Sequence, residues 1–147
     1  MEIRKGHRTA LSSRLVVLDQ TLSEFERWAR GQVTVSVLYQ EEDNLSSDQC
    51  ERILAEVAAA REILARLREA LALKPERLKV RQAIATRCSM LWELLTELEP
   101  RYLKRYGPLT LEAAEYLGEK VRQLQQRVEA MGRRVKGKGE SGSQGRH

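Results

Sequence analysis

Apolar residues recur along this chain of 147 residues at alternating steps of four and three, and this spacing limits the fold more than any other feature. Such steps place apolar side chains on one stripe of an α-helix, as in coiled coils. Four stripes of this kind occur in order along the chain: Leu11, Leu15, Leu18, Leu22, Phe25 and Ala29; Ile53, Val57, Ala60, Leu64, Leu67 and Leu71; Val80, Ile84, Cys88, Leu91, Leu95 and Leu98; and Leu117, Val121, Leu124, Val128, Met131 and Val135. The pattern predicts an all-α protein, an antiparallel up-down bundle of four long helices with coiled-coil-like seams.

Capping residues and prolines predict where these helices begin and end. Ser46 and Ser47 offer side-chain oxygens to cap the second helix, and Thr110 offers one to cap the fourth. Pro75 ends the second helix and suits the first position of the third, because proline needs no hydrogen-bond partner there. After Pro100 the chain can form one or two further helical turns before it is stopped at Gly107.

The segment WARGQVTVSVLYQEEDN, residues 28–44, fits both a strand and a helix. Val33, Val35 and Val37 alternate with polar residues, as in a half-buried strand. A strand needs a partner for its backbone groups, and no second alternating run is present. Val33 and Val37 also continue the first apolar stripe by steps of four. We therefore predict that the first helix extends through this segment with a kink near Gly31, and we keep a strand as the alternative.

Charge is distributed unevenly along the chain. The formal net charge is +5, to which residues 1–14 contribute +3 and residues 133–147 contribute +4, leaving −2 for the rest. From residue 136 onward no apolar residue occurs, a composition typical of disorder. We expect a basic N-terminal arm at 1–8, a helical bundle at 9–135 and a disordered basic tail at 136–147.

The residue types present exclude several chemistries. The only histidines are His7 and His147, and the only cysteines are Cys50 and Cys88, which are too few for a zinc site or a helical di-iron site. No glycine-rich phosphate loop lies between a strand and a helix. We therefore expect a protein that is not an enzyme and that has no catalytic residues, metal or cofactor.

The sequence also predicts where the protein resides. No apolar run approaches the roughly 20 residues of a membrane-spanning helix. Two cysteines do not form a disulfide framework and suit a reducing compartment. The interpretation is a cytoplasmic, intracellular protein.

Two basic groups on or beside the predicted third helix could contact phosphates or an acidic partner. They are Lys74, Arg77 and Arg81, whose spacings of three and four predict one shared helix face, followed by Arg101, Lys104 and Arg105. Basic groups can hold a phosphate backbone by releasing counterions. Acidic residues are interspersed with them, and solvated helix faces account for them more simply. A nucleic-acid-binding helical protein is therefore the alternative reading.

Around its two tryptophans the chain resembles a spectrin repeat. The residues that carry the resemblance are Glu24, Phe25 and Trp28 in the first helix and Cys88, Trp92 and Leu95 in the third. It covers about residues 10–106 and implies a cytoskeletal or membrane-scaffold adaptor. The alternative is that both tryptophans fill the core of a bundle.

These observations favour a protein–protein interaction module, either a scaffold or adaptor or a small subunit of an assembly. We expect it to bind a partner helix, or a second copy, through apolar surface on the first and fourth helices. The predicted contact residues are Trp28, Val33, Val37 and Tyr39.

Overall fold

The structure is a computed structural model that describes the backbone of residues 1–145 and the side chains of residues 1–136. Within this range every regular element is helical, apart from one isolated β-bridge, so the predicted all-α class is confirmed. The chain divides into two compact units, residues 1–76 and 77–147, and each is described by itself below.

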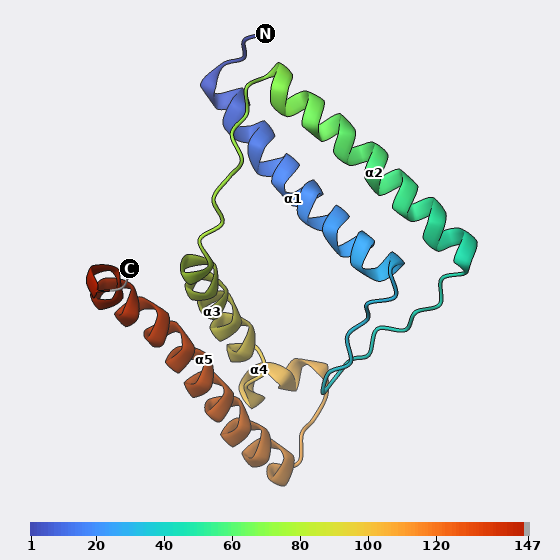
Figure 1. Ribbon diagram of the computed structural model, residues 1–147. Coiled ribbons are helices and arrows are strands. Elements are labelled where there is room, and N and C mark those ends of the chain that lie inside the picture. The colour runs from blue at the N-terminus through green and yellow to red at the C-terminus, as the bar shows by residue number, and fades with distance from the viewer. Residues whose placement is uncertain (146–147) are drawn as a thin grey trace. The chain divides into compact units, whose positions relative to one another are not determined.

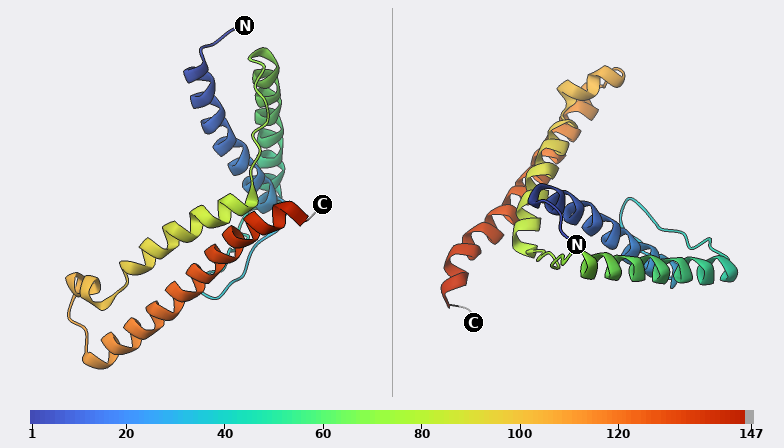
Figure 2. Two further views of the ribbon diagram at one scale, coloured as in Figure 1. Left: turned by 90° about the vertical axis from the view of Figure 1, so that its left-hand side faces the viewer. Right: turned by 90° about the horizontal axis from the view of Figure 1, so that it is seen from above.

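The first unit is a hairpin of two long antiparallel helices, α1 (Lys5–Ala29) and α2 (Ser47–Ala70), which lie side by side (Figures 1 and 2). Ser46 caps α2 as predicted, because its hydroxyl accepts a hydrogen bond from the Gln49 backbone N–H. The Gln49 side chain in turn accepts one from the Ser46 N–H, which completes a capping box.

The connection between these helices corrects the prediction of a continuous first helix. α1 ends at Ala29, and Gly31 follows with a φ of 78°, a left-handed conformation that side chains other than glycine rarely adopt. Beyond it the chain turns back on itself through the bridge between Val35 and Gln40. The segment is therefore neither the predicted helix nor a strand of a sheet, because this single bridge is the one β-type pairing in the described part of the chain.

The second unit is a hairpin of α3 (Val80–Thr96) and α5 (Leu111–Gly145), joined by the short helix α4 (Pro100–Leu103) and the 3₁₀ turn η1 (Lys104–Tyr106) (Figure 1). Thr110 caps α5 as predicted, since its hydroxyl accepts a hydrogen bond from the Ala113 N–H at 3.1 Å. The described residues thus form five α-helices rather than the predicted four, because α4 is a separate turn that packs on α5.

The third predicted helix begins later than expected. α3 starts at Val80, not at Pro75, and Lys79 before it offers no side-chain cap. Lys74 precedes a proline, which disfavours helical backbone, and Leu78 is largely exposed. With no buried side chain and no cap, residues 75–79 have nothing to offset the cost of starting a helix.

The basic ends of the chain are partly described. α1 already begins at Lys5, within the predicted arm. α5 extends to Gly145, but the side chains of residues 137–145 and all of residues 146–147 lie outside the described part. The disordered tail at 136–147 stays a prediction.

Each hairpin has a thin core. The buried residues are Leu22, Ala29, Val57 and Leu71 in the first unit and Cys88, Val121 and Val128 in the second. Two helices can shield only the line along which they touch, so most of each apolar stripe keeps some contact with solvent.

Candidate interaction surfaces

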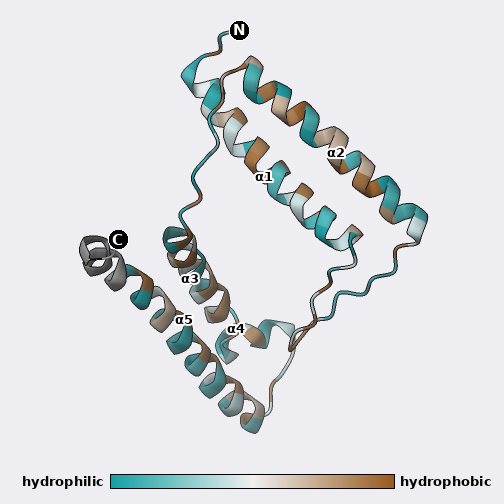
Figure 3. Ribbon diagram, in the orientation of Figure 1, coloured by the Kyte–Doolittle hydropathy of each residue, from teal (hydrophilic) through white to brown (hydrophobic). Residues whose placement is uncertain are grey.

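Apolar residues recur along all four long helices (Figure 3), but only half of each predicted stripe lies between paired helices. In α1, Leu22 and Ala29 are buried against α2. Asp19 and Glu26 lie beside these residues on α1, and their carboxylates are 4.0 Å and 2.6 Å from the Arg61 guanidinium of α2. A salt bridge thus occupies part of the inner face.

The other half of the first stripe lies at one edge of the hairpin. On α1 it consists of Leu11, Leu18 and Phe25, seven residues apart, and the facing residues of α2 are Ile53, Ala60 and Leu67. We call these six residues the α1·α2 apolar edge. Leu18 and Phe25 are exposed, whereas the α2 members are half-buried.

The second hairpin is closer-packed along its inner face because α5 places glycine there. A methyl group added at Gly132 would lie 3.5 Å from Cβ of Cys88, and one added at Gly118 would lie 3.8 Å from the Pro100 ring. Between them, the Gln125 side-chain amide donates to the Thr96 hydroxyl at 3.1 Å. These contacts fix the register of α3 on α5.

Six large apolar residues of this hairpin lie at one edge. They are Ile84 and Leu91 of α3, Leu98 in the turn directly after it, and Leu117, Leu124 and Met131 of α5, and we call them the α3·α5 apolar edge. On α5 each directly precedes an inner-face position, and on α3 Ile84 and Leu91 lie four residues before and three residues after the buried Cys88. Leu124 is 51% exposed, Met131 49%, Leu91 43% and Leu98 42%. The edge is therefore an open apolar stripe.

The opposite edge of the second hairpin is mostly polar. Its residues are Gln82, Ser89 and Thr96 of α3 and Glu115, Arg122 and Glu129 of α5, and Trp92, 41% exposed, lies beside Ser89 and Thr96. The contrast matters because water solvates an exposed polar edge, whereas a contiguous exposed apolar edge is typical of an interaction site.

A cleft lies at the connection end of the first hairpin. It has a volume of about 420 Å³, and Phe25, Trp28 and Val33 line it together with Leu45 and Ile53. The Phe25 and Trp28 rings stack with centroids 6.1 Å apart. Of the predicted contact residues, Trp28 and Val33 therefore lie at one site.

Glu41 organises the connection beside this cleft. Its carboxylate accepts hydrogen bonds from the Arg27 guanidinium at 3.3 Å and from the Thr34 backbone N–H at 2.8 Å. The bonds from Arg27 lower the pKa of Glu41, and that from Thr34 adds to the effect, while partial burial opposes it. The buried Nε1 of Trp28 has no hydrogen-bond partner among the described atoms.

The other two predicted contact residues lie at the tip of the same connection. The Ser36 N–H donates to the Tyr39 carbonyl at 2.9 Å and the Glu41 N–H to that of Thr34 at 2.8 Å, which closes a small hairpin-like turn. Val37 and Leu38 at its end are each 93% exposed, and Tyr39 is 58% exposed. The predicted set is thus divided between a cleft and an exposed tip.

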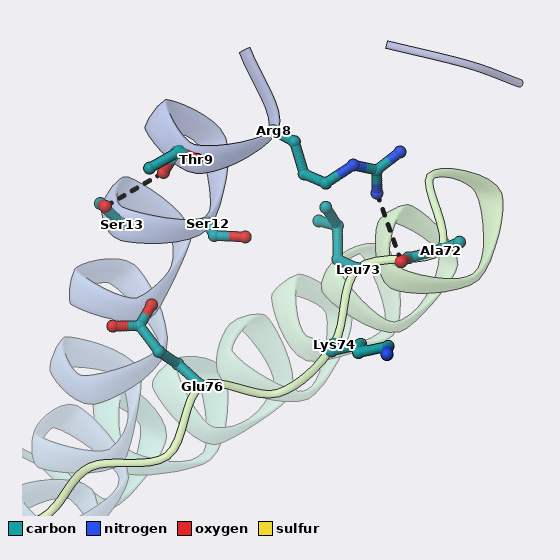
Figure 4. Close-up of a pocket in the computed structure, with 8 residues that line it drawn as sticks. All are labelled: Arg8, Thr9, Ser12, Ser13, Ala72, Leu73, Lys74 and Glu76. Carbon is teal, nitrogen blue, oxygen red and sulfur yellow. Dashed lines mark hydrogen bonds between the residues drawn. The ribbon is translucent and has the colours of Figure 1, made fainter. Parts of the chain in front are cut away.

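A second hollow, of about 570 Å³, lies at the open end of the first hairpin, between the start of α1 and the segment after α2 (Figure 4). Arg8 donates to the carbonyls of Leu71 and Ala72, which directly follow α2. Hydroxyls of α1 and the side chains of Lys74 and Glu76 complete the lining. Because helix C-termini leave carbonyls unpaired, Arg8 acts here as a structural cap.

The predicted phosphate-contacting residues do not form one surface within either unit. Lys74 belongs to the first unit, and Lys74 and Arg77 lie outside helices, so the predicted shared helix face with Arg81 is wrong. Arg101 lies in α4, 4.7 Å above the Tyr102 ring, and pairs with Glu99. The remaining two, Lys104 and Arg105, are exposed in η1.

The six residues of the α3·α5 apolar edge were assigned to a buried seam by sequence reasoning, so their exposure was missed. A signal was available, because Gly118, Gln125 and Gly132 recur every seven residues directly after Leu117, Leu124 and Met131. Small or polar residues that recur every seven positions indicate the line along which two helices approach closely. Large side chains then lie beside that line rather than on it.

Other classes of site find no support in the described part of the chain. No group of three or more histidine, cysteine or acidic side chains there could hold a metal ion. No described helix has a stretch long and apolar enough to cross a bilayer. No protein-family model, curated protein or solved structure matches this chain. The spectrin-repeat resemblance stays a prediction.

Proposed function

We propose that this protein is a non-enzymatic protein–protein interaction module that binds a partner helix along the α3·α5 apolar edge. The observation that carries the proposal is the contrast within one hairpin, which has six apolar residues at one edge and mostly polar residues at the other. A groove between two helices suits the apolar face of a third.

The available burial is sufficient for specific binding. Covering the exposed half of Leu91, Leu98, Leu124 and Met131 would contribute about 1 kcal/mol each, before the cost of association is subtracted. A helix that contacts the edge from Leu117 to Met131 would lie along about 21 Å, or four turns. Such a helix would be a modest but specific partner, as expected for an adaptor or a small subunit.

The first hairpin supplies a second candidate surface. Trp28 and Val33 in the cleft and Val37 and Tyr39 near the tip stay proposed contact residues, by binding or by self-association. The antiparallel up-down bundle of four long helices predicted from the sequence also stays a proposal.

Binding of a synthetic helix tests the proposal. The probe is a peptide of 28 residues, or roughly eight turns, with a leucine stripe at steps of three and four and glutamine at the positions that flank it. We expect the full chain to bind this peptide in fluorescence anisotropy and to retain binding as salt is raised, because apolar burial is weakly screened.

The variant L91D/L124D should abolish this binding, because it places two charges in the edge. Its matched control is S89D/Q126D, which adds the same charges to α3 and α5 at exposed positions away from the edge. Binding that survives L91D/L124D, or that both variants weaken equally, would refute the edge as the site. Circular dichroism checks that both variants remain helical.

One observation keeps nucleic-acid binding as the alternative. Arg101 and Arg105 each lie over a neighbouring tyrosine ring, Tyr102 and Tyr106, and Tyr106 is largely exposed. Cationic and aromatic groups together can hold single strands. That function predicts binding to an oligonucleotide with a steep dependence on salt, lost in R101E/R105E and unchanged in L91D/L124D.

A further inference from the structure

A row of basic residues runs beside the α3·α5 apolar edge. Lys120, Arg127 and Arg134 lie three residues after Leu117, Leu124 and Met131, so they form a straight column on α5 at the border of the edge. All three are exposed. On α3 the corresponding border position after Ile84 is Arg87, which is also exposed.

These cations are not neutralised within their own helices. Side chains three and four residues away are neighbours on a helix. Those positions around Arg87, Lys120, Arg127 and Arg134 contain no acidic residue. Among the described side chains none of the four forms an ion pair, whereas Arg133, which points elsewhere on α5, pairs with Glu129 at 2.8 Å.

From this border we infer that the partner of the α3·α5 apolar edge is an amphipathic helix whose apolar stripe is flanked by glutamate or aspartate. The inference rests on the proposed function and adds the charge of the partner. Carboxylates beside the apolar stripe of a docked helix would meet Lys120, Arg127 and Arg134 along one side and Arg87 along the other. Such complementarity sets partner choice and orientation.

Charge also argues against other occupants. The same edge of a second copy carries the same cations, so two copies would bring like charges together. The border of the α1·α2 apolar edge is formed by Arg14, Thr21 and Trp28 on α1 and by Glu56, Ile63 and Ala70 on α2. This border contains one carboxylate, that of Glu56, and therefore no row of acidic residues.

The test compares three peptides on the full chain. They share the leucine stripe described above and carry glutamine, glutamate or lysine at the flanking positions. We expect the glutamate peptide to bind at least tenfold more tightly than the lysine peptide at low salt. The ratio should fall as salt screens the border charges.

Charge reversal on α5 sharpens this test. The variant K120E/R127E/R134E should reverse the preference, so that the lysine peptide binds more tightly. Its matched control, R122E/R133E/K136E, makes the same change in charge at exposed positions off the border and should keep the preference for the glutamate peptide.

The possible results separate the inference from the function beneath it. Equal binding of all three peptides, still lost in L91D/L124D, would overturn the acidic partner and leave the helix-binding function intact. Binding of none would overturn both. A wild-type dimer in light scattering that L91D/L124D converts to monomer would assign the edge to a second copy and overturn the inference.

Discussion

The two hairpins pair their helices in the same way but differ in the residues on their inner faces. In both, half of an apolar stripe lies between the paired helices and half lies at one edge. In the first hairpin the inner face carries Arg61, which joins Glu26 and Ser23 of α1 through hydrogen bonds of 2.6 Å and 3.0 Å. In the second the inner face carries Gly118 and Gly132, and the described contacts across it include no ion pair.

This difference shows which contacts hold each pair of helices together. Polar bonds across the first hairpin fix its register without help from outside, and Arg8 and Glu41 tie its two ends. The second hairpin relies on close approach and leaves an open apolar edge with a basic border. Polar bonds hold the first hairpin together, whereas the second has the edge at which we propose that a partner helix binds.

The largest expected effect tests whether the two cores are separate. Val57 and Val121 are each 4% exposed, so V57D or V121D would bury an unpaired charge and cost about 3 kcal/mol or more. We expect each variant to unfold its own hairpin while the amides of the other stay protected in hydrogen exchange. Loss of protection in both hairpins from either substitution would show that the units fold as one.

The next effect concerns the bonds across the first hairpin. Arg61→Ala removes three polar contacts with α1 and should lower the free energy of unfolding by about 1 kcal/mol. The control Arg66→Ala removes an exposed pair with Glu62 within α2 and should cost only about 0.3 kcal/mol. Urea denaturation measures both, and equal costs would contradict the role given to Arg61.

A gain in stability should come from the second hairpin. Gly132→Ala places a methyl group at ordinary contact distance from Cys88 and removes a flexible residue from α5, so we expect a gain of about 0.5–1 kcal/mol. Gly31→Ala is the contrasting variant, because its left-handed backbone disfavours alanine, and it should destabilise the first hairpin. If Gly132→Ala destabilised the protein, the helices would have to be closer than described.

The smallest expected effect is a dependence on acid confined to the first hairpin. Bonds from Arg61 and then Arg30 lower the pKa of Glu26 below its ordinary value of 4.5, and Arg27 lowers that of Glu41. A carboxyl whose folded pKa is lowered stabilises the fold above its unfolded pKa, and that contribution is lost as pH falls through the folded value. Stability of the first hairpin should therefore decline below pH 4.5.

Hydrogen exchange as a function of pH, read separately for residues 1–76 and 77–147, would measure this. The double variant E26Q/E41Q should be less stable at neutral pH and should lose most of the decline. An equal decline in the second hairpin would mean that other carboxyls dominate.

Much of this fold could be predicted from the sequence. Steps of three and four placed the four long helices, and the caps at Ser46 and Thr110 were identified because a side-chain oxygen lies about two turns before each apolar stripe begins. The continuation through Val33 and Val37 was wrong, because the spacing of two valines does not outweigh a left-handed glycine at position 31.

The candidate site was harder to predict because one stripe is compatible with two inner faces. Val121 can share an inner face with Leu117 and Leu124, and it can equally share one with Gly118 and Gln125. The partner helix decides between them, since α3 comes closest where α5 has no bulk at Gly132. The pairing of α3 with α5, and therefore the exposed edge, depends on contacts distant in sequence that periodicity does not contain.

The chain has only two cysteines, and each belongs to a different hairpin. Cys88 is buried against Gly132, whereas Cys50 is half-buried in the first turn of α2. The rate at which each thiol is alkylated therefore reports how readily its own unit opens. A helix seated beside Leu91 should slow alkylation of Cys88 and leave that of Cys50 unchanged.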